Sequence, residues 1–162
     1  TIKESCDVAG LPTTVGTEEW RGRIAKGDEV AVARLKAAGA VVFGKTNIPV
    51  LAMDVQSFNP IYGSTSNPWN LACTPGGSSG GAAAAVAAGL TPFELGSDVG
   101  GSIRTPAAFC GTYGHRPTYG IVPMRGPLQP RWPMECLVRG PIARTPADLK
   151  LLLEVMTGPE DR

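Results

Sequence analysis

Helical patterns alternate with short apolar runs along this sequence of 162 residues. Residues 28–38 place apolar side chains at near-helical spacing after an acidic start, and Gly39 follows where a C-terminal cap belongs. The run 40–43 (AVVF) comes next and predicts a strand that is buried on both faces. Helices that alternate with such strands favour an α/β fold, with a mixed, largely parallel sheet flanked by helices.

Two more helices are predicted farther along the chain. Residues 81–88 form an alanine-rich helical pattern that Gly89 closes, and the run 92–95 predicts a short strand after it. The last helix is expected over residues 145–156. Its boundary signals are an N-cap, a first-turn proline, an acidic residue three positions after the cap and a glycine beyond the end: Thr145, Pro146, Asp148 and Gly158. We find no internal repeat and no linker, so residues 1–162 are interpreted as one domain.

The charge and apolar patterns exclude several function classes. The net charge is +1, and no cluster of Lys and Arg alternates with aromatic residues, so no direct nucleic-acid partner is expected. The longest apolar stretch, residues 81–90, is about half the length that spans a bilayer. These features predict a cytoplasmic protein that acts on a small molecule and not on a membrane. The chain starts without Met, and we expect that a segment precedes it.

The cysteines give no sign of a metal site. There are four of them, widely spaced and without a CxxC pair, and the chain has one histidine: Cys6, Cys73, Cys110, Cys136 and His115. We therefore expect reduced, structural cysteines and no bound metal.

The segment 39–46 (GAVVFGKT) matches the phosphate-binding pattern GxxxxGK[ST]. That loop needs a strand before the first glycine and a helix after the Ser or Thr. Here a helix ends at Gly39, the middle residues are the predicted strand, and Pro49 follows too soon for an uninterrupted helix. We interpret both glycines as element boundaries.

The segment 76–81 (GGSSGG) satisfies the nucleophile-elbow pattern GxSxG on Ser78 and on Ser79. Asp98 and His115 follow in the order of a serine esterase of the α/β-hydrolase type, which remains an alternative. An elbow needs a strand that runs into it, whereas residues 71–75 are short and end in proline. The helix after the motif makes a flexible linker a poor interpretation, and it predicts a serine at a helix N-terminus.

The segment 96–104 (GSDVGGSIR) follows a predicted strand and contains a glycine pair before Ser102. Glycines let consecutive backbone N–H groups turn toward one point, as stabilisation of an oxyanion requires. Ser102 is then a candidate nucleophile, and an ordinary tight turn is the alternative.

Together, segments 76–81 and 96–104, with Ser78 and Ser102 24 positions apart, resemble the amidase signature family. Further matching segments extend over nearly the whole chain: residues 2–4, 10–14, 44–47, 67–69, 106–107, 110–111, 116–118 and 140–145. The resemblance implies the amidase signature fold. Because members usually have several hundred residues, it also implies a catalytic core that lacks N-terminal and C-terminal parts.

The resemblance also implies an activity and a site. The expected reaction is hydrolysis of a linear carboxylic amide through an acyl-enzyme on Ser102, with Ser78 as bridging serine after a cis peptide bond and Lys3 as base. Backbone N–H groups of four residues are expected to bind the oxyanion: Val99, Gly100, Gly101 and Ser102. The expected supporting residues are Gly77, Ser79, Asp98 and Arg104. Lys45 matches a segment without a catalytic role, and no metal or cofactor is implied.

Lys3 can act as a base only if its surroundings lower its pKa. At the usual value of about 10.4, roughly one lysine in 2,500 is neutral at pH 7. Burial in a core strand next to Ile2 would favour the neutral form. Two positions depart from the family pattern: Glu4 stands where many members have Asp, and His115 where a lysine is common. These differences bear on substrate class and not on the three catalytic positions.

The substrate and the assembly stay open at the sequence level. A small-molecule amide is the expected partner, and a homodimer is one alternative for the oligomeric state. The same chemistry would also serve a glutaminase-type subunit that releases ammonia for an amidotransferase. A non-catalytic or binding role for this segment is a further alternative. A loop over residues 124–132 is a candidate contributor to the substrate pocket.

Overall fold

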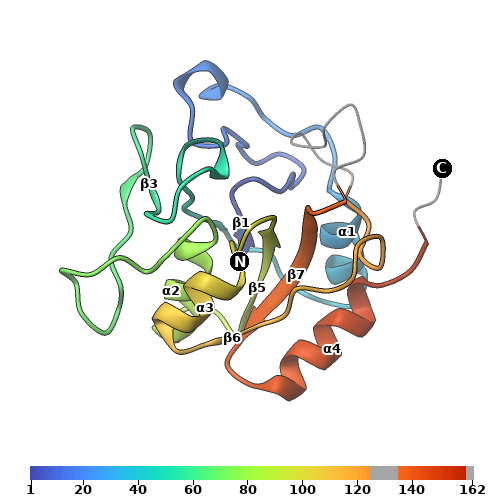
Figure 1. Ribbon diagram of the computed structural model, residues 1–162. Coiled ribbons are helices and arrows are strands. Elements are labelled where there is room, and N and C mark those ends of the chain that lie inside the picture. Colours follow the sequence, from blue (N-terminus) through green and yellow to red (C-terminus); the bar gives the residue numbers. More distant parts are fainter. Residues whose placement is uncertain (125–134, 160–162) are drawn as a thin grey trace.

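The computed structural model describes residues 1–124 and 135–159, and its centre is one five-stranded sheet (Figure 1). The strand order is β2-β1-β5-β7-β6. The strands are β1 (Ile2–Lys3), β2 (Lys45–Thr46), β5 (Phe93–Asp98), β6 (Tyr113–Gly114) and β7 (Val138–Ala143). β1 is parallel to β2 and to β5, while β7 is antiparallel to its neighbours β5 and β6. All strands except β7 therefore run in one direction, which confirms the predicted mixed, largely parallel sheet.

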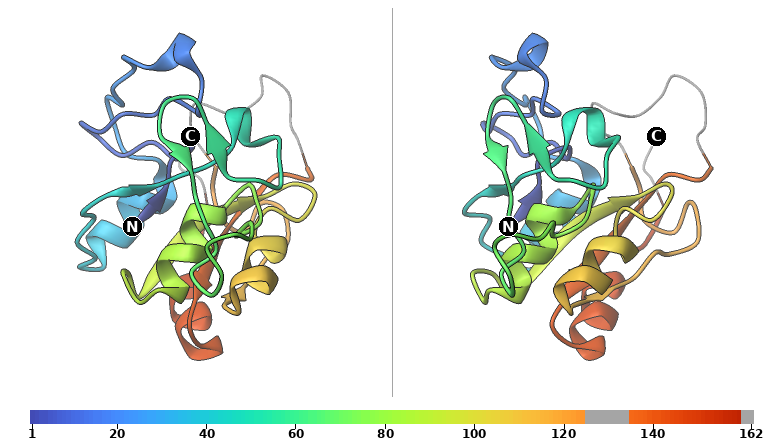
Figure 2. Two further views of the ribbon diagram at one scale, coloured as in Figure 1. Left: turned by 90° about the vertical axis from the view of Figure 1, so that its left-hand side faces the viewer. Right: turned by 60° about the vertical axis from the view of Figure 1, so that its left-hand side comes forward.

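Helices cover both faces of this sheet. α1 (Val30–Ala37) and α4 (Pro146–Met156) pack on one face, and α2 (Gly80–Ala87) and α3 (Arg104–Cys110) pack side by side on the other (Figure 2). Each pair closes its own apolar cluster against the sheet. The helices predicted over 28–38, 81–88 and 145–156 are thereby confirmed to within two residues at each end. No helix in the described ranges is long and apolar enough to cross a membrane.

The strand predicted over residues 40–43 is wrong. These residues are irregular, and the strand lies just after them, at β2. Val41 and Phe43 are 84% and 66% exposed, whereas Ala40 and Val42 pack against the core. A continuous apolar run was expected to be buried on both faces. Instead, the run leads into β2, which is an edge strand that pairs only with β1 within the described part of the chain, and two of the four apolar side chains of the run are exposed.

Loops and short elements extend beyond the carboxyl ends of β1 and β5, at the top of Figure 1. They include two 3₁₀ helices and a hairpin: η1 (Glu18–Trp20), η2 (Val50–Ala52), β3 (Phe58–Asn59) and β4 (Gly63–Ser64). In open α/β sheets, ligands bind outside the carboxyl ends of the strands. The fold therefore directs the search for a site to this end of the sheet.

The start of α2 packs directly on the chain after β2, and a glycine makes this contact possible. A Cβ atom on Gly81 would lie 2.5 Å from the backbone N and 2.6 Å from the backbone O of Asn47. Glycine-to-alanine changes in a helix otherwise stabilise by about 1 kcal/mol. We expect Gly81→Ala to lower the free energy of unfolding by about 1–3 kcal/mol, because the backbone must move. Denaturant unfolding of the full chain measures this.

Gly22→Ala is the control for that substitution, because a Cβ atom there has no neighbour within 4 Å. It should change the stability by less than about 0.5 kcal/mol. A Gly81→Ala protein as stable as the wild type would show that α2 does not pack on Asn47 as described.

Candidate active site

Lys3 ends β1 as a fully buried lysine whose amine contacts two serines. Strand alternation sends Ile2 into the α1 and α4 cluster and Lys3 to the opposite face of the sheet. Its Nζ lies 2.7 Å from Ser78 Oγ, 2.9 Å from Ser97 Oγ and 3.4 Å from the Ser97 carbonyl oxygen. The amine is therefore fixed between the start of α2 and the end of β5.

The surroundings lower the pKa of Lys3 to about 7. Burial is the largest cause, because a charged amine loses its hydration there, and the positive charge of Arg139 is the second. An amine with this pKa is about half neutral at pH 7. The desolvation expected from the sequence is thus present, and Lys3 is able to accept a proton near neutral pH.

Ser78 is held in a turn that only glycines allow. The Gly77–Ser78 peptide bond is cis, and a Cβ atom on Gly77 would lie 2.9 Å from Val55 Cα and collide with the Asp54 carbonyl oxygen. Ser79 occupies the N-cap position of α2 without capping it, and its Oγ donates to the Ser97 carbonyl at 3.3 Å. No strand enters this turn, so the strand–turn–helix of a nucleophile elbow is not formed.

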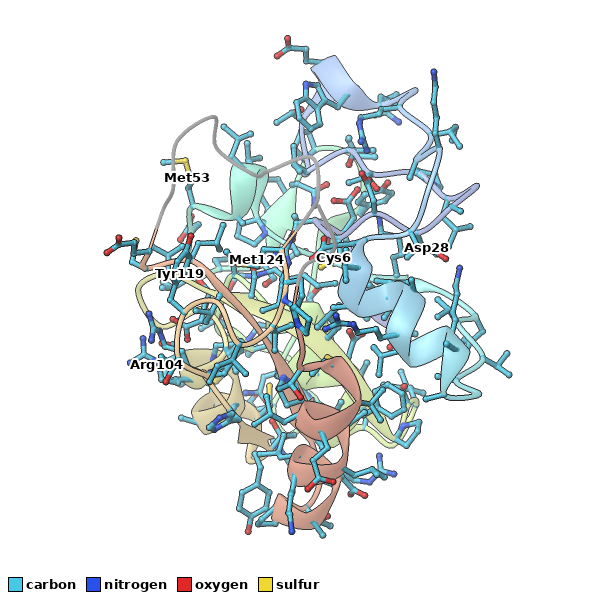
Figure 3. All side chains as sticks on the ribbon, turned by 90° about the vertical axis from the view of Figure 1, so that its right-hand side faces the viewer. Cys6, Asp28, Met53, Arg104, Tyr119 and Met124 are labelled. Atoms are coloured by element: carbon cyan, nitrogen blue, oxygen red, sulfur yellow. The ribbon has the colours of Figure 1, made fainter. Side chains whose placement is uncertain are left out.

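Asp98 organises the segment that carries Ser102. Its buried carboxylate accepts hydrogen bonds from the backbone N–H groups of Gly101 (2.8 Å) and Ile103 (3.0 Å) and from the Arg104 side chain (2.9 and 3.0 Å). Burial alone would raise the pKa of Asp98, but these hydrogen bonds lower it to about 2. Arg104 projects from the start of α3 at the molecular surface (Figure 3). An ionised Asp98 thus fixes the loop from 99 to 104.

The four predicted oxyanion donors differ in whether their N–H groups already form a hydrogen bond. Gly101 has a φ of +125° and commits its N–H to Asp98. The N–H groups of Val99, Gly100 and Ser102 form no hydrogen bond with any residue in the described ranges. Among the described residues, three of the four N–H groups thus have no partner, whereas Gly101 uses its N–H to shape the loop.

The two serine segments meet at one cavity. The backbone N–H of Ser79 donates to the Ser102 carbonyl at 3.1 Å and joins the segments directly. A cavity of about 560 Å³ is lined by Ser78, Ser97, Ser102 and Arg139, and its apolar walls include Leu51 and Leu137. Residues 125–132 of the predicted pocket loop lie outside the described residues. The cavity brings the candidate nucleophile and the Lys3–Ser78 pair to one place.

Other candidate residues lie apart from this cavity. His115 is exposed, its backbone N–H donates to the Pro141 carbonyl, and its ring forms no hydrogen bond to Asp98 or to a serine in the part that the structure describes. Lys45 donates to the Pro12 carbonyl at 2.6 Å and to Thr13 Oγ1 at 2.7 Å. The geometry of a serine–aspartate–histidine triad is therefore absent among these residues.

Two residues at the site had no role in the sequence analysis. Ser97 contacts Lys3 through its hydroxyl and its carbonyl, and it lies inside the segment 96–104, so its position could have identified it. Arg139 lines the cavity and is 2% exposed. A charged residue within the apolar run 137–143 was the available signal.

Comparisons with known proteins identify the family of this chain. The family model described as Amidase matches residues 1–162. A glutamyl-tRNA(Gln) amidotransferase subunit of Methanosarcina acetivorans is 44% identical over 161 residues, which are 99% of this chain and 33% of that protein. An acylamidase of Rhodococcus erythropolis is 47% identical, over 99% of this chain and 33% of that protein.

A solved structure extends the agreement to the fold. The structure of 6-aminohexanoate cyclic dimer hydrolase with its substrate superposes with a TM-score of 0.93 at 37% identity, over 98% of this chain and 34% of that one. This chain spans about a third of the length of the curated relatives it matches. The match of the family model along all 162 residues shows that the chain belongs to the amidase family, whose members carry the amidase signature.

Proposed function

We propose that residues 1–162 form the catalytic core of an enzyme that hydrolyses carboxylic amides through an acyl-enzyme on Ser102. Ser78 is the bridging serine and Lys3 is the base. The observation that carries the proposal is the buried contact of 2.7 Å between Lys3 Nζ and Ser78 Oγ, at the cavity that Ser102 also lines. Family membership and the acylamidase relative support the reaction class.

The three contacts of Lys3 fit a neutral amine. Such an amine has two N–H donors and one lone pair. The Ser97 carbonyl can only accept, so one N–H points to it, and the second is available for Ser97 Oγ. The lone pair is then left for the hydroxyl hydrogen of Ser78. Ser78 Oγ, having given its hydrogen to Lys3, can accept one from Ser102.

The reaction follows from this chain of donors. Ser102 Oγ attacks the amide carbonyl while its proton passes through Ser78 to Lys3. The oxyanion that forms is bound by the N–H groups of Val99, Gly100 and Ser102, which have no partner in the described ranges. The C–N bond then breaks, and the amine leaves with the proton returned by way of Ser78. Water attacks the acyl-enzyme by the same relay and releases the acid and Ser102.

The cavity favours a small amide with an apolar portion. Its apolar residues, such as Leu51, Met53 and Leu137, lie beside the serines. Similarity to an amidotransferase subunit keeps ammonia release from glutamine as a second candidate. Hydrolysis rates separate the two candidate functions. They are measured for a panel of aliphatic, aryl and amino-acid amides, and for glutamine alone and with a partner protein. Activity on glutamine that depends on a partner would select the second candidate.

The pH dependence of acylation tests whether the reaction needs a neutral base with a pKa near 7. Because the pKa of Lys3 is lowered to about 7, the neutral base is lost as the pH falls below that value. We expect kcat/KM to fall about tenfold per pH unit below pH 7 and to be level above it. Histidine has an ordinary pKa of about 6.5, so the profile alone does not distinguish the two bases.

The His115→Ala variant makes that distinction. We expect it to keep the shape of the profile and a rate within about tenfold of the wild type, since the loss of a triad base costs roughly 10⁴. A folded His115→Ala protein without activity would favour the serine esterase alternative over the lysine base.

A further inference from the structure

Arg139 and Glu29 form a fully buried ion pair beside the proposed site. Arg139 lies on β7, and Glu29 is the residue just before α1. The Nε and Nη2 atoms of Arg139 donate to the two carboxylate oxygens of Glu29 at 2.6 and 2.9 Å. The two residues are 2% and 1% exposed. Burial is costly for both charges, so a pair at this place calls for an explanation beyond stability.

Arg139 is linked to the Lys3 amine through Ser97, its partner on β5. It pairs directly with Ser97 across β5 and β7, and residues opposite one another in an antiparallel pair share a face. Ser97 Oγ in turn lies 2.9 Å from Lys3 Nζ, and Arg139 lines the same cavity as Ser78. Glu29 engages only two guanidinium nitrogens, and Nη1 has no hydrogen-bond partner in the ranges described. The guanidinium of Arg139 thus lines the cavity of the proposed site with one nitrogen that Glu29 does not engage.

Three other titratable groups act on the pKa of Lys3, and each is neutral, partly neutral or paired with a cation. They are Cys6, Glu94 and Asp98. Burial raises the pKa of Cys6 to about 12 and that of Glu94 to about 7, so the thiol is neutral and the carboxyl is partly so. Asp98 is ionised but paired with Arg104. Burial would lower the pKa of Arg139, yet the charge and hydrogen bonds of the Glu29 carboxylate raise it above its usual value, so the guanidinium stays charged.

We propose that Arg139, held by Glu29, is a positioning residue whose fixed positive charge keeps Lys3 in its neutral, proton-accepting form. The inference rests on the proposed function, because it assigns a purpose to a neutral Lys3. After burial, Arg139 is the largest contribution that lowers the pKa of Lys3. A guanidinium suits this task, since it does not lose its own proton in a protein. Arg139 acts on the amine and not on the reacting atoms.

The double variant Glu29→Gln/Arg139→Met tests this charge effect. Removing Arg139 alone would leave a buried carboxylate unpaired, whereas the double change removes both charges. NMR of ¹³Cε-labelled lysine in the full chain gives the Lys3 titration directly, with Lys3→Met to assign the signal. We expect the midpoint to rise by about one pH unit, and acylation at pH 6 to be about tenfold slower with an unchanged plateau at high pH.

The pair Arg23–Asp7 supplies a matched control. It is also bidentate, at 2.7 and 2.9 Å, and neither residue is among the groups that shift the pKa of Lys3. Asp7→Asn/Arg23→Met removes the same charges and should leave the Lys3 midpoint unchanged. A thermal melt checks that both double variants fold.

The single variant Glu29→Gln gives a shift of opposite sign and keeps the test open if the double variant does not fold. It retains the guanidinium and removes its counter-charge, so the Lys3 midpoint should fall. A midpoint that stays fixed or rises in Glu29→Gln, or stays fixed in the folded double variant, overturns the inference. The inference is also overturned if the double variant changes only the KM of anionic substrates, because Arg139 would then be a residue that contacts the substrate. The NMR titration is independent of turnover, so failure of the proposed function appears separately, as undiminished acylation in Lys3→Met.

Discussion

Replacing Lys3 with methionine is expected to slow acylation by about 10⁴-fold, the loss typical of a missing general base. Methionine has a similar length and no proton to exchange, so it fills the buried space and leaves the Ser78 hydroxyl without an acceptor. Single-turnover kinetics with a chromogenic amide measure the acylation step, and a melt confirms that the variant folds.

Lys45→Met is the matched control for this loss. Lys45 lies on β2, the neighbour of β1, and burial lowers its pKa as well. Its amine contacts Pro12 and Thr13 and neither Ser78 nor Ser97. We expect Lys45→Met to keep the acylation rate within about tenfold. Equal losses in the two variants would show that burial of a lysine, and not its contact with Ser78, determines the rate.

Ser102→Ala is expected to abolish turnover through an acyl-enzyme, because no other hydroxyl takes the place of the nucleophile. The residual rate should be lower than that of the wild type by at least about 10⁴-fold. Ser78→Ala should also be slow, since Lys3 and Ser102 then lack the bridging hydroxyl, but its nucleophile remains. Rates of amide hydrolysis in the full chain measure both losses.

Ser79→Ala is the control for the serine variants, because it alters the neighbour of Ser78 in the same turn. Its hydroxyl contacts the backbone of Ser97 and not Lys3. A residual rate in Ser102→Ala close to that of Ser79→Ala would move the nucleophile to another residue.

The main elements could be predicted where the sequence carries local signals. The helix at 145–156 has an N-cap, and the structure shows Thr145 Oγ1 accepting from the Asp148 N–H at 3.1 Å. The prediction of a strand over residues 40–43 was wrong because apolar composition alone does not show which side chains of a segment the rest of the fold buries. The two-residue strands β1, β2 and β6 are too short to have a periodic signal, and only pairing defines them.

The sequence allowed a prediction of the candidate site only for residues that lie in recognisable motifs. Segments 76–81 and 96–104 indicated Ser78 and Ser102, and the resemblance to a family indicated Lys3. The contacts of Lys3 with Ser97 could not be predicted, because they depend on the pairing of β1 with β5. The proximity of Arg139 depends in the same way on the register of β5 with β7. The use of the Gly101 N–H by Asp98 depends on loop geometry that a spacing pattern does not specify.

Mass-spectrometric mapping of a fluorophosphonate label tests the central claim most directly. The label bonds covalently to an activated serine, so it marks the nucleophile and reports the base that activates it. In the full chain at pH 8, the account predicts one labelled peptide with the label on Ser102. It also predicts no label in Ser102→Ala, labelling in Lys3→Met that is slower by orders of magnitude, and wild-type labelling in Lys45→Met. Label on Ser78 or Ser79 in the wild type, or undiminished labelling of Lys3→Met, would contradict the assigned roles.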